Sequence, residues 1–388
     1  MNRENHGRSI EVLTAMGNLP TAPYCEGAVI EWLLKWAERL GDSAGVRRDK
    51  VGNVYVEYVR GKRSSAPLVI EGHLDHPGFV VTGRARDGTL RAEFRGGVRP
   101  SFFAGARAKF WHEKRWVGAT VKRVRQVKGK RTLPVELTGV KEKLKAGTLG
   151  MWDLPDATVR RGIFAARVCD DLAGAAAIVC LIEQLVAGKV AGHVIGLFTR
   201  AEEVGFAGVL AVCEGGWIPR KARVIGLETS KASAAGGGAE QGAGAVIRVG
   251  DRTGIFSAGL THFLAQCAGH IGDEDSDFRY QRRLMDGGTC NSTAFLVYGY
   301  DSAALCLALG NYHNMTVKGE IGWGDGAKAG KGIASETIHI DDFTGMVRIL
   351  VEAVKRIGAY QPGLKVVRQR LSTMYREEQA AMFVKSPV

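Results

Sequence analysis

The sequence predicts an α/β protein whose main sheet is interrupted by an inserted β-domain. Before residue 80 and after residue 160, short apolar runs alternate with helical patterns, which is typical of an α/β sheet. Between Val81 and Arg160 the chain changes to short alternating stretches separated by turns rich in glycine and charge, which indicates a small β-domain. We therefore expect residues 1–80 and 161–388 to form one α/β domain and residues 81–160 to be inserted into it.

The first part of the α/β domain has one clear helix and one clear strand. The helix is expected to bury the face formed by Val29, Leu33, Trp36 and Leu40, and to end at Gly41. The segment 67–71 (Pro-Leu-Val-Ile-Glu) has the length and composition of a short buried strand, and it runs directly into Gly72 and His73.

The second part shows the alternation most clearly. Residues 172–186 are rich in Ala, Leu and Ile and predict a buried helix, and residues 193–199, 222–227 and 302–308 predict central strands. The closing helix follows Asp341 and Asp342 and precedes Gly358. Its apolar residues have helical spacing and are Phe343, Met346, Val347, Leu350, Val351 and Val354.

Charge is distributed unevenly. The net charge is +13, and residues 81–160 hold 19 of the 53 Lys and Arg residues but only 7 of the 40 Asp and Glu residues. The inserted domain therefore carries nearly all of the excess. Such a field attracts acidic substrates, nucleic acid or an anionic surface, although a solvated basic surface without a partner explains it equally well.

The rest of the composition argues against membrane-spanning, secreted and disulfide-rich proteins. No apolar run is long enough for a membrane-spanning helix, and the amino terminus lacks the apolar stretch of a secretory signal. The seven cysteines are widely spaced without a Cys-x-x-Cys pair, so neither a disulfide framework nor a cysteine zinc cluster is indicated. We expect a cytoplasmic protein with reduced thiols.

Histidines and carboxylates follow the predicted strands. His73 and Asp75 follow the first strand, Glu202 and Glu203 follow the strand 193–199, and Glu228 follows the strand 222–227. Asp170 and Asp171 precede the helix at 172–186, and His313 follows the strand 302–308. Because sites in open α/β sheets lie beyond the carboxyl ends of the strands, we expect these side chains to meet at one edge.

So many carboxylates in one place would repel one another unless cations were bound. Imidazole together with carboxylate oxygen suits zinc, and also cobalt or manganese. Two ions that share one carboxylate need about five protein ligands, and the sequence supplies His73, Asp170, Glu203, Glu228 and His313. Glu202 is left as the general base, and Asp75 is left to accept the second N–H of His73.

Four segments resemble the glutamyl- and tetrahedral-aminopeptidase family of dinuclear-metal exopeptidases. They are Gly72-His-Leu-Asp-His-Pro-Gly-Phe79, Cys169-Asp-Asp-Leu-Ala-Gly174, Ala201-Glu-Glu-Val-Gly205 and Gly287-Gly-Thr289. The resemblance implies a mixed central sheet flanked by helices, as in phosphorylase/hydrolase-like metallopeptidases, with an inserted small β-barrel. It also implies homo-oligomers, from dimers up to dodecamers.

The resemblance also assigns roles to residues. It makes Asp170 the bridging carboxylate, with His73 and Glu228 completing one metal shell and Glu203 and His313 completing the other. The peptide bond between Asp170 and Asp171 is expected to be cis, as in relatives.

Three residues depart from the family pattern. Glu228 stands where these aminopeptidases usually have Asp, Leu172 replaces a frequent Arg, and Cys290 replaces the Asp that normally follows Gly-Gly-Thr. The metal site keeps its full set of carboxylate and imidazole ligands despite these changes, because Glu228 is still a carboxylate, but the choice of substrate is left open. Cys290 is expected to be a buried small residue, and His76 a loop residue and not a third histidine ligand.

The predicted function is the release of amino-terminal residues from peptides, acidic ones included, by water activated at two divalent ions. A carboxypeptidase or N-acyl-amino-acid deacylase using the same ions is the near alternative. A non-catalytic binding protein is the alternative of a different class. A nucleic-acid partner rests on the basic insert alone and is the weakest, since Phe110, Trp111 and Trp116 are explained by a barrel core or a subunit contact.

Overall fold

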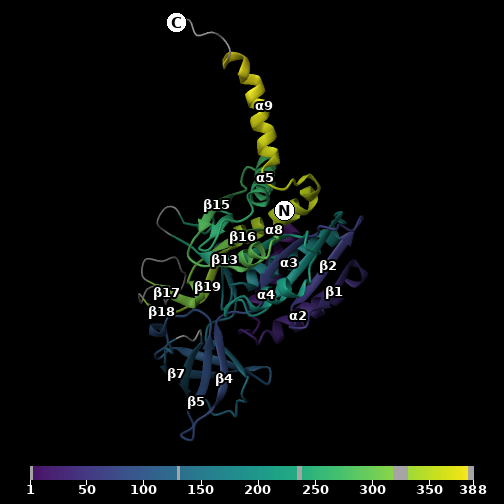
Figure 1. Ribbon diagram of the computed structural model, residues 1–388. Coiled ribbons are helices and arrows are strands. Elements are labelled where there is room, and N and C mark those ends of the chain that lie inside the picture. The colour runs from purple at the N-terminus through teal and green to yellow at the C-terminus, as the bar shows by residue number, and fades with distance from the viewer. Residues whose placement is uncertain (1–2, 129–131, 234–237, 318–330, 383–388) are drawn as a thin grey trace, which may run out of the picture.

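The centre of the molecule is an eight-stranded mixed sheet. The computed structural model describes residues 3–128, 132–233, 238–317 and 331–382 (Figure 1). The strand order is β1-β2-β12-β3-β13-β16-β14-β15. The strands are β1 (Ala44–Arg48), β2 (Val54–Arg60), β3 (Leu68–His73), β12 (Gly192–Thr199), β13 (Arg223–Lys231), β14 (Ala245–Asp251), β15 (Tyr280–Met285) and β16 (Asp301–Leu309).

Four neighbouring central strands, β12, β3, β13 and β16, run parallel to one another. They correspond to the four strands predicted from the sequence, and their residues are buried almost throughout, as expected for strands covered on both faces. Strand β13 continues to Lys231, beyond the predicted end, so Glu228 lies inside the strand and does not follow it. The expected mixed α/β architecture is confirmed.

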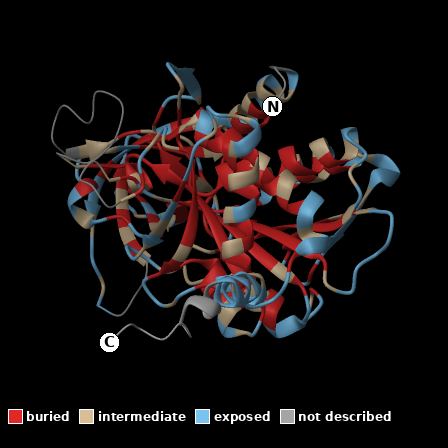
Figure 2. Ribbon diagram, turned by 90° about the horizontal axis from the view of Figure 1, so that it is seen from above, coloured by how far each residue is buried: buried red, intermediate tan, exposed pale blue. Residues whose placement is uncertain are grey.

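Helices cover both faces of the sheet, and Figure 2 shows the buried strands lying between partly exposed helices. Successive residues of β3 point to opposite faces of the sheet, so Leu68 and Ile70 belong to the core cluster on one face and Val69 to the cluster on the other. The first cluster includes residues of α1 (Arg3–Gly17), α2 (Gly27–Glu38), α3 (Leu172–Ala187), α5 (Ala258–Glu274) and α8 (Ile340–Arg356). The second includes residues of α4 (Ala207–Gly215) and α6 (Asn291–Val297).

After β3 the chain leaves the sheet and forms a closed six-stranded barrel. All of its pairings are antiparallel, in the order β4-β5-β8-β7-β6-β9. Its strands are β4 (Gly78–Arg84), β5 (Leu90–Arg95), β6 (Arg107–His112), β7 (Arg115–Val124), β8 (Thr132–Thr138) and β9 (Leu149–Trp152). Figure 1 places it at the opposite end of the molecule from the carboxyl terminus.

Aromatic side chains fill the barrel. Phe79 packs edge-to-face on Phe94 at 4.8 Å and on Trp152 at 4.9 Å between ring centroids. Phe110 is fully buried in the same cluster, so of its two expected explanations the barrel core holds and the subunit contact does not. Trp111 and Trp116 are only partly buried, which leaves part of their surface available.

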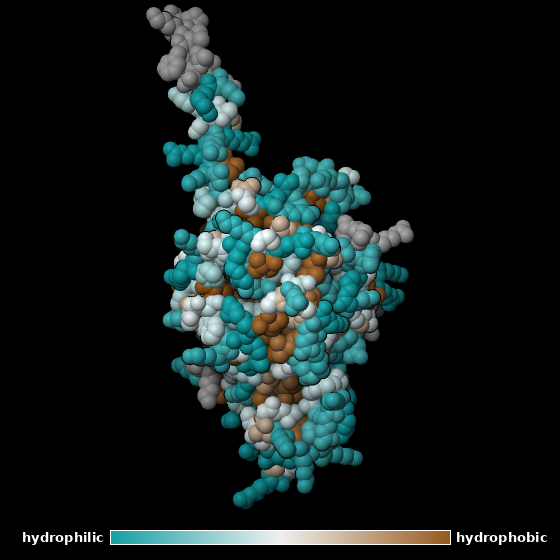
Figure 3. Space-filling model, turned by 90° about the vertical axis from the view of Figure 1, so that its right-hand side faces the viewer, coloured by the Kyte–Doolittle hydropathy of each residue, from teal (hydrophilic) through white to brown (hydrophobic). Residues whose placement is uncertain are grey.

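Smaller elements complete the fold. A three-stranded sheet contains β10 (Thr158–Arg160), β11 (Ile163–Ala166) and β19 (Glu336–His339), and β17 (Met315–Val317) pairs with β18 (Lys331–Ile333). Short 3-10 helices are η1 (Gly41–Ser43), η2 (Pro100–Phe102), η3 (Tyr312–Asn314) and η4 (Ile357–Ala359). The last helix, α9 (Lys365–Met382), projects away from the body (Figures 1 and 3). None of the helices that the structure describes is long and apolar enough to span a bilayer.

Candidate metal centre

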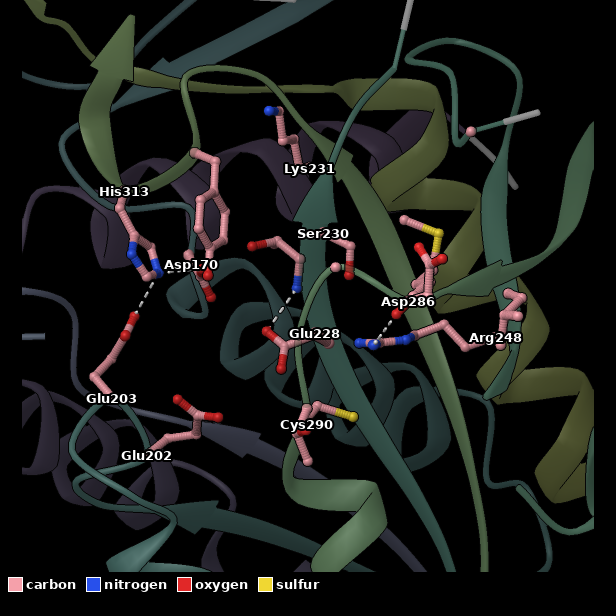
Figure 4. A pocket seen from close by; sticks show the side chains of 18 of the residues that line it. Asp170, Glu202, Glu203, Glu228, Ser230, Lys231, Arg248, Asp286, Cys290 and His313 are labelled. Carbon is pink, nitrogen blue, oxygen red and sulfur yellow. Dashed lines mark hydrogen bonds and ion pairs between the residues drawn. The ribbon is translucent and has the colours of Figure 1, made fainter. Parts of the chain in front are cut away.

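The predicted site residues meet at one edge of the sheet. Parallel strands bring their carboxyl ends to the same side, so the end of β3 presents His73, the loop after β12 presents Glu202 and Glu203, and β13 presents Glu228. Asp170 arrives from the segment between β11 and α3, and His313 from η3 after β16. Asp170, Glu202, Glu203, Glu228 and His313 line a cavity of about 810 Å³, and Figure 4 shows how they lie in it.

One group of metal-compatible side chains consists of His73, Asp170 and Glu228. His73 Nε2 lies 3.4 Å from Asp170 Oδ1 and 3.8 Å from Glu228 Oε1. His73 Nδ1 lies 3.1 Å from the carbonyl oxygen of Asp75, so donation to that oxygen leaves the Nε2 lone pair directed at the carboxylates.

The second group consists of Asp170, Glu203 and His313. His313 Nε2 lies 3.1 Å from Glu203 Oε1 and 3.5 Å from Asp170 Oδ2. Its Nδ1 lies 2.9 Å from the carbonyl oxygen of Gly97, in the barrel segment between β5 and β6, which orients this ring in the same manner.

Asp170 belongs to both groups and offers one oxygen to each. In each group the candidate ligand atoms lie within 4.8 Å of one another. Asp170 Oδ1 is buried and has no hydrogen-bond partner among the described residues. A buried carboxylate oxygen without a donor is costly, and two imidazoles with three carboxylates are a donor set that divalent transition metals accept. The residues present therefore fit a pair of divalent cations.

Without cations, protons shared between the histidines and the carboxylates would offset the charge of this cluster. Burial alone would lower the pKa of His73 and of His313, but the surrounding carboxylates outweigh it and raise both pKa values. Burial would raise the pKa of Asp170, but the neighbouring imidazoles of His313 and His73 lower it. Cations would replace these shared protons, because a ligating imidazole must be neutral at the bound nitrogen.

Glu202 belongs to neither of the two groups found among the described residues. Its carboxylate points into the same cavity as those of Glu203 and Glu228 (Figure 4). Burial and the charges of Glu228, Glu203 and Asp75 raise the pKa of Glu202, opposed by His73. A raised pKa near other carboxylates is typical of an acid–base group.

Asp75 holds the main chain at this point. Its carboxylate accepts hydrogen bonds from Glu202 N at 2.9 Å and from Glu203 N at 3.1 Å. The same carboxylate lies 3.5 Å from His73 Nδ1, farther than the carbonyl oxygen of Asp75 itself. Asp75 therefore connects the end of β3 to the loop after β12, and the atom of Asp75 nearest to His73 Nδ1 is its main-chain oxygen and not the expected carboxylate.

Two further carboxylates position the ligands. Glu336 is fully buried, and its carboxylate accepts hydrogen bonds from Cys169 N, Asp170 N and His313 N at 2.8, 3.0 and 2.8 Å. Asp171 caps α3 by accepting from Gly174 N at 3.1 Å, and it also accepts from His73 N at 3.3 Å. The peptide bond between Asp170 and Asp171 is cis, as expected.

Neither His76 nor Cys290 is placed to act on a substrate. His76 is buried, and both ring nitrogens are occupied, Nδ1 by the Asp170 carbonyl at 2.7 Å and Nε2 by Asn314 Oδ1 at 3.0 Å. Cys290 lines the cavity but is 3% exposed, and burial raises the pKa of its thiol to about 12 despite the positive charge of Arg248. This thiol stays protonated near neutral pH.

Sequence reasoning did not find Glu336 or Arg248. Glu336 follows His313 by 23 residues in a stretch without a helical or strand pattern, so nothing in the sequence indicated it. Arg248 lines the cavity from β14, is 3% exposed, and has a buried Nε without a hydrogen-bond partner among the described residues. A charged residue inside the apolar run of β14 was the available signal.

Comparison with known proteins agrees with this geometry. The family model of the M42 glutamyl aminopeptidases matches residues 52–318. No curated protein matches the chain.

Solved structures share the fold. A TET aminopeptidase from a marine sediment archaeon of the Thaumarchaeota is 18% identical, covering 90% of this chain and 97% of its own, with a TM-score of 0.73. An aminopeptidase of Desulfurococcus kamchatkensis is 18% identical, covering 90% and 95%, with a TM-score of 0.72. The TET1 peptidase of Pyrococcus horikoshii is 21% identical, covering 89% and 99%, with a TM-score of 0.71, and it can assemble into a tetrahedron or an octahedral shell. This chain belongs to the M42 glutamyl aminopeptidase family.

Proposed function

We propose that this metal-dependent exopeptidase removes amino-terminal residues from peptides at a pair of divalent cations. The observation that carries the proposal is Asp170, whose two carboxylate oxygens face two different histidine–carboxylate groups in one cavity. In this proposal His73 and Glu228 hold one cation, Glu203 and His313 hold the other, and Asp170 bridges them.

The residues then have distinct tasks. Bound cations would polarise the scissile carbonyl and make a water more acidic. Glu202 takes a proton from the attacking water at a carboxylate oxygen as the new C–O bond forms. It then gives that proton to the leaving nitrogen as the C–N bond breaks. Asp75 holds the Glu202 main chain so that its carboxylate stays in the cavity.

Glu202→Gln tests the assignment of the base. The amide cannot accept the proton, so we expect kcat to fall by at least ~10²-fold while metal content is retained. Glu203→Gln is the matched neighbour, and it should lower metal content as well as activity. Full activity in Glu202→Gln would place proton transfer on another group.

Arg248 bears on the substrate class. Its guanidinium lies buried in the cavity wall together with Glu228 and Cys290, and a buried cation with an unfilled donor suits a substrate carboxylate. An acidic amino-terminal side chain would supply that group, and the basic barrel would raise the association rate of such peptides. A free α-carboxylate would supply it equally well, so Arg248 also supports a carboxypeptidase or deacylase as the second candidate.

A substrate panel separates these candidates. Aminoacyl, N-acyl and carboxy-terminal peptide substrates are compared with zinc, cobalt or manganese added, for the wild-type chain and for Arg248→Met. We expect turnover of aminoacyl substrates, with acidic residues losing most kcat/KM in Arg248→Met and neutral residues losing little. Exclusive turnover of N-acyl or carboxy-terminal substrates would establish the second candidate, and no turnover in any arm would favour a binding protein.

The proposal extends to the native ion, the cellular location, the inserted domain and the assembly of the chain. We propose zinc as the native ion, with cobalt or manganese as substitutes, and a cytoplasmic location consistent with seven free cysteines. We propose that residues 81–160 act as an inserted domain between the two parts of the α/β domain, 1–80 and 161–388. We also propose a homo-oligomer, between a dimer and a dodecamer, with Trp111 and Trp116 of the barrel at a subunit contact.

A further inference from the structure

The last helix of the chain is unlike the other long helices, because most of its described side chains are exposed. Helix α9 (Lys365–Met382) projects from the body, and every described side chain from Arg368 to Glu377 is exposed (Figure 1). The α/β body does not need α9 for its core, since none of the residues of α9 belongs to a core cluster of the described residues.

An apolar stripe nevertheless runs along this helix, and all of its members except the half-buried Val367 are exposed. Leu364 just before the helix, and Val367, Leu371 and Met374 within it, follow one another at intervals of three, four and three residues. Leu364, Leu371 and Met374 are 46%, 58% and 49% exposed. This spacing places them on one face, and alternating intervals of three and four are typical of a coiled-coil seam. In Figure 3 hydrophobic atoms lie among hydrophilic ones on the projecting arm.

The residues beside the stripe determine which partner it fits. Arg368 and Tyr375 flank one side of the stripe, and Arg370 and Glu377 flank the other. We propose that α9 pairs antiparallel with α9 of a second copy of this chain, with Leu371 packed against Met374 of the partner subunit. In a two-fold pair each contact occurs twice.

In this register the residues that flank the stripe form favourable contacts between the two copies. With Leu371 opposite Met374 of the partner subunit, heptad geometry brings Arg370 beside Glu377 of the partner subunit and Arg368 beside Tyr375 of the partner subunit. The first is an opposite-charge pair and the second is a cation–π pair. A parallel pair loses the first of these contacts, because residues 370 and 377 of different copies would then lie apart along the axis. The same face therefore matches itself in charge as well as in hydrophobicity.

Pairing through α9 is independent of the metal site and goes beyond the proposed function. It needs neither the cavity nor the barrel, so two assemblies of the body could be joined by it. The contact is small, because 18 residues of helix span only ~27 Å, and we therefore expect it to depend on concentration.

Sedimentation velocity of the full-length chain over a concentration series tests the seam. Leu371→Asp combined with Met374→Asp should raise the concentration needed for the largest species at least tenfold. Ser372→Asp combined with Thr373→Asp changes the outward face by the same charge and should leave it unchanged. Because α9 is exposed, circular dichroism and thermal melting of the body should match wild type in all of these variants. Association unchanged by the seam substitutions overturns the proposal.

Charge reversal tests the antiparallel register. Arg370→Glu alone and Glu377→Arg alone should each weaken association several-fold, because each places like charges together. An equimolar mixture of the two variants should regain wild-type association, since each reversed residue then meets an opposite charge in the partner copy. Arg376→Glu, on the outward face, is the matched control and should change little. Weakened single variants whose mixture does not recover would overturn the antiparallel pairing.

Discussion

The two halves of the candidate metal site are built differently. His73 ends β3 in the middle of the sheet, where neighbouring strands fix its main chain, and its ring is oriented by a residue two positions away. His313 lies in η3 with a positive φ of 53°, and its ring is oriented by Gly97, which is 216 residues away in sequence. Both rings face the same carboxylate of Asp170.

The difference shows how far each half depends on the rest of the chain. The His73 half depends mainly on the sheet, with support from Asp75 and Asp171, because a strand end projects its side chains in a fixed direction. The His313 half needs an unfavourable backbone conformation, which persists only when surroundings over-determine it. Those surroundings are the Glu336 carboxylate on the main chain, the barrel carbonyl on the ring, and Tyr312 stacked on the ring at 3.8 Å between centroids.

The largest expected effect comes from removing what the halves share. Asp170→Asn replaces a bridging carboxylate by a neutral amide, so we expect loss of both ions and a fall in kcat/KM on the order of 10³-fold or more. His73→Ala and His313→Ala each remove a ligand from one half only. Elemental analysis should find about one ion left in each histidine variant, against none in Asp170→Asn. Equal metal content in all three variants would contradict a shared ligand, and a wild-type protein without transition metal would contradict the site.

Glu336→Gln should have a smaller effect, and it should weaken metal binding in the His313 half only. Its amide oxygen can still accept from the two N–H groups at Cys169 and Asp170, which places the amide nitrogen against the N–H of His313. Residues that orient metal ligands are worth about 10–100-fold in metal affinity, so we expect that loss for the ion at His313 and little change for the ion at His73.

Asp342→Asn is the matched control for this substitution. Asp342 is also a buried carboxylate that accepts from two main-chain N–H groups, at Gly242 and Gly244, but it touches no candidate ligand. Titration with chelators of graded strength measures the two affinities. A uniform loss at both ions, or an equal loss in Asp342→Asn, would mean that Glu336 does not act on the His313 half specifically.

The smallest expected effect is a pH dependence that both halves share. In the metal-free protein the pKa values of His73 and His313 are raised in the folded state, so the stability they contribute is full below their unfolded pKa of about 6.5. That contribution is lost as pH rises through the higher folded pKa values. We expect the Tm of metal-free protein to fall by a few degrees between about pH 6 and 9, and that of metal-loaded protein to fall less.

Single histidine variants locate this dependence. His73→Gln and His313→Gln should each flatten the metal-free profile in part, because each removes one shifted group. A profile that steepens toward acid instead would mean that the lowered pKa of Asp170 dominates, since a lowered carboxyl pKa gives stability that is lost as pH falls.

The sequence by itself determined the elements and the chemistry of the site. Apolar runs of strand length identified all four central strands, because strands buried on both faces carry little but hydrophobic residues. The residues after these strands indicated His73, Glu202, Glu203 and His313 as site candidates, because the ends of parallel strands share one edge. Asp170 was indicated by its place just before the helix at 172–186. The closing helix, α8, followed from its spacing, although Asp342 in its first turn binds two distant glycines and not its own helix.

Only the tertiary structure decided which distant residues hold those ligands in place. Glu336 reaches the site from β19, Gly97 from the barrel and Arg248 from β14. The hydrogen bonds that join His313 to Glu336 and to Gly97 span 23 and 216 residues of sequence. Local periodicity reports on which face of an element is buried, whereas a hydrogen bond between distant segments depends on how whole elements pack. The interior position of Phe110 and the extension of β13 past Glu228 were decided in the same way, by barrel closure and by pairing of β13 with β16.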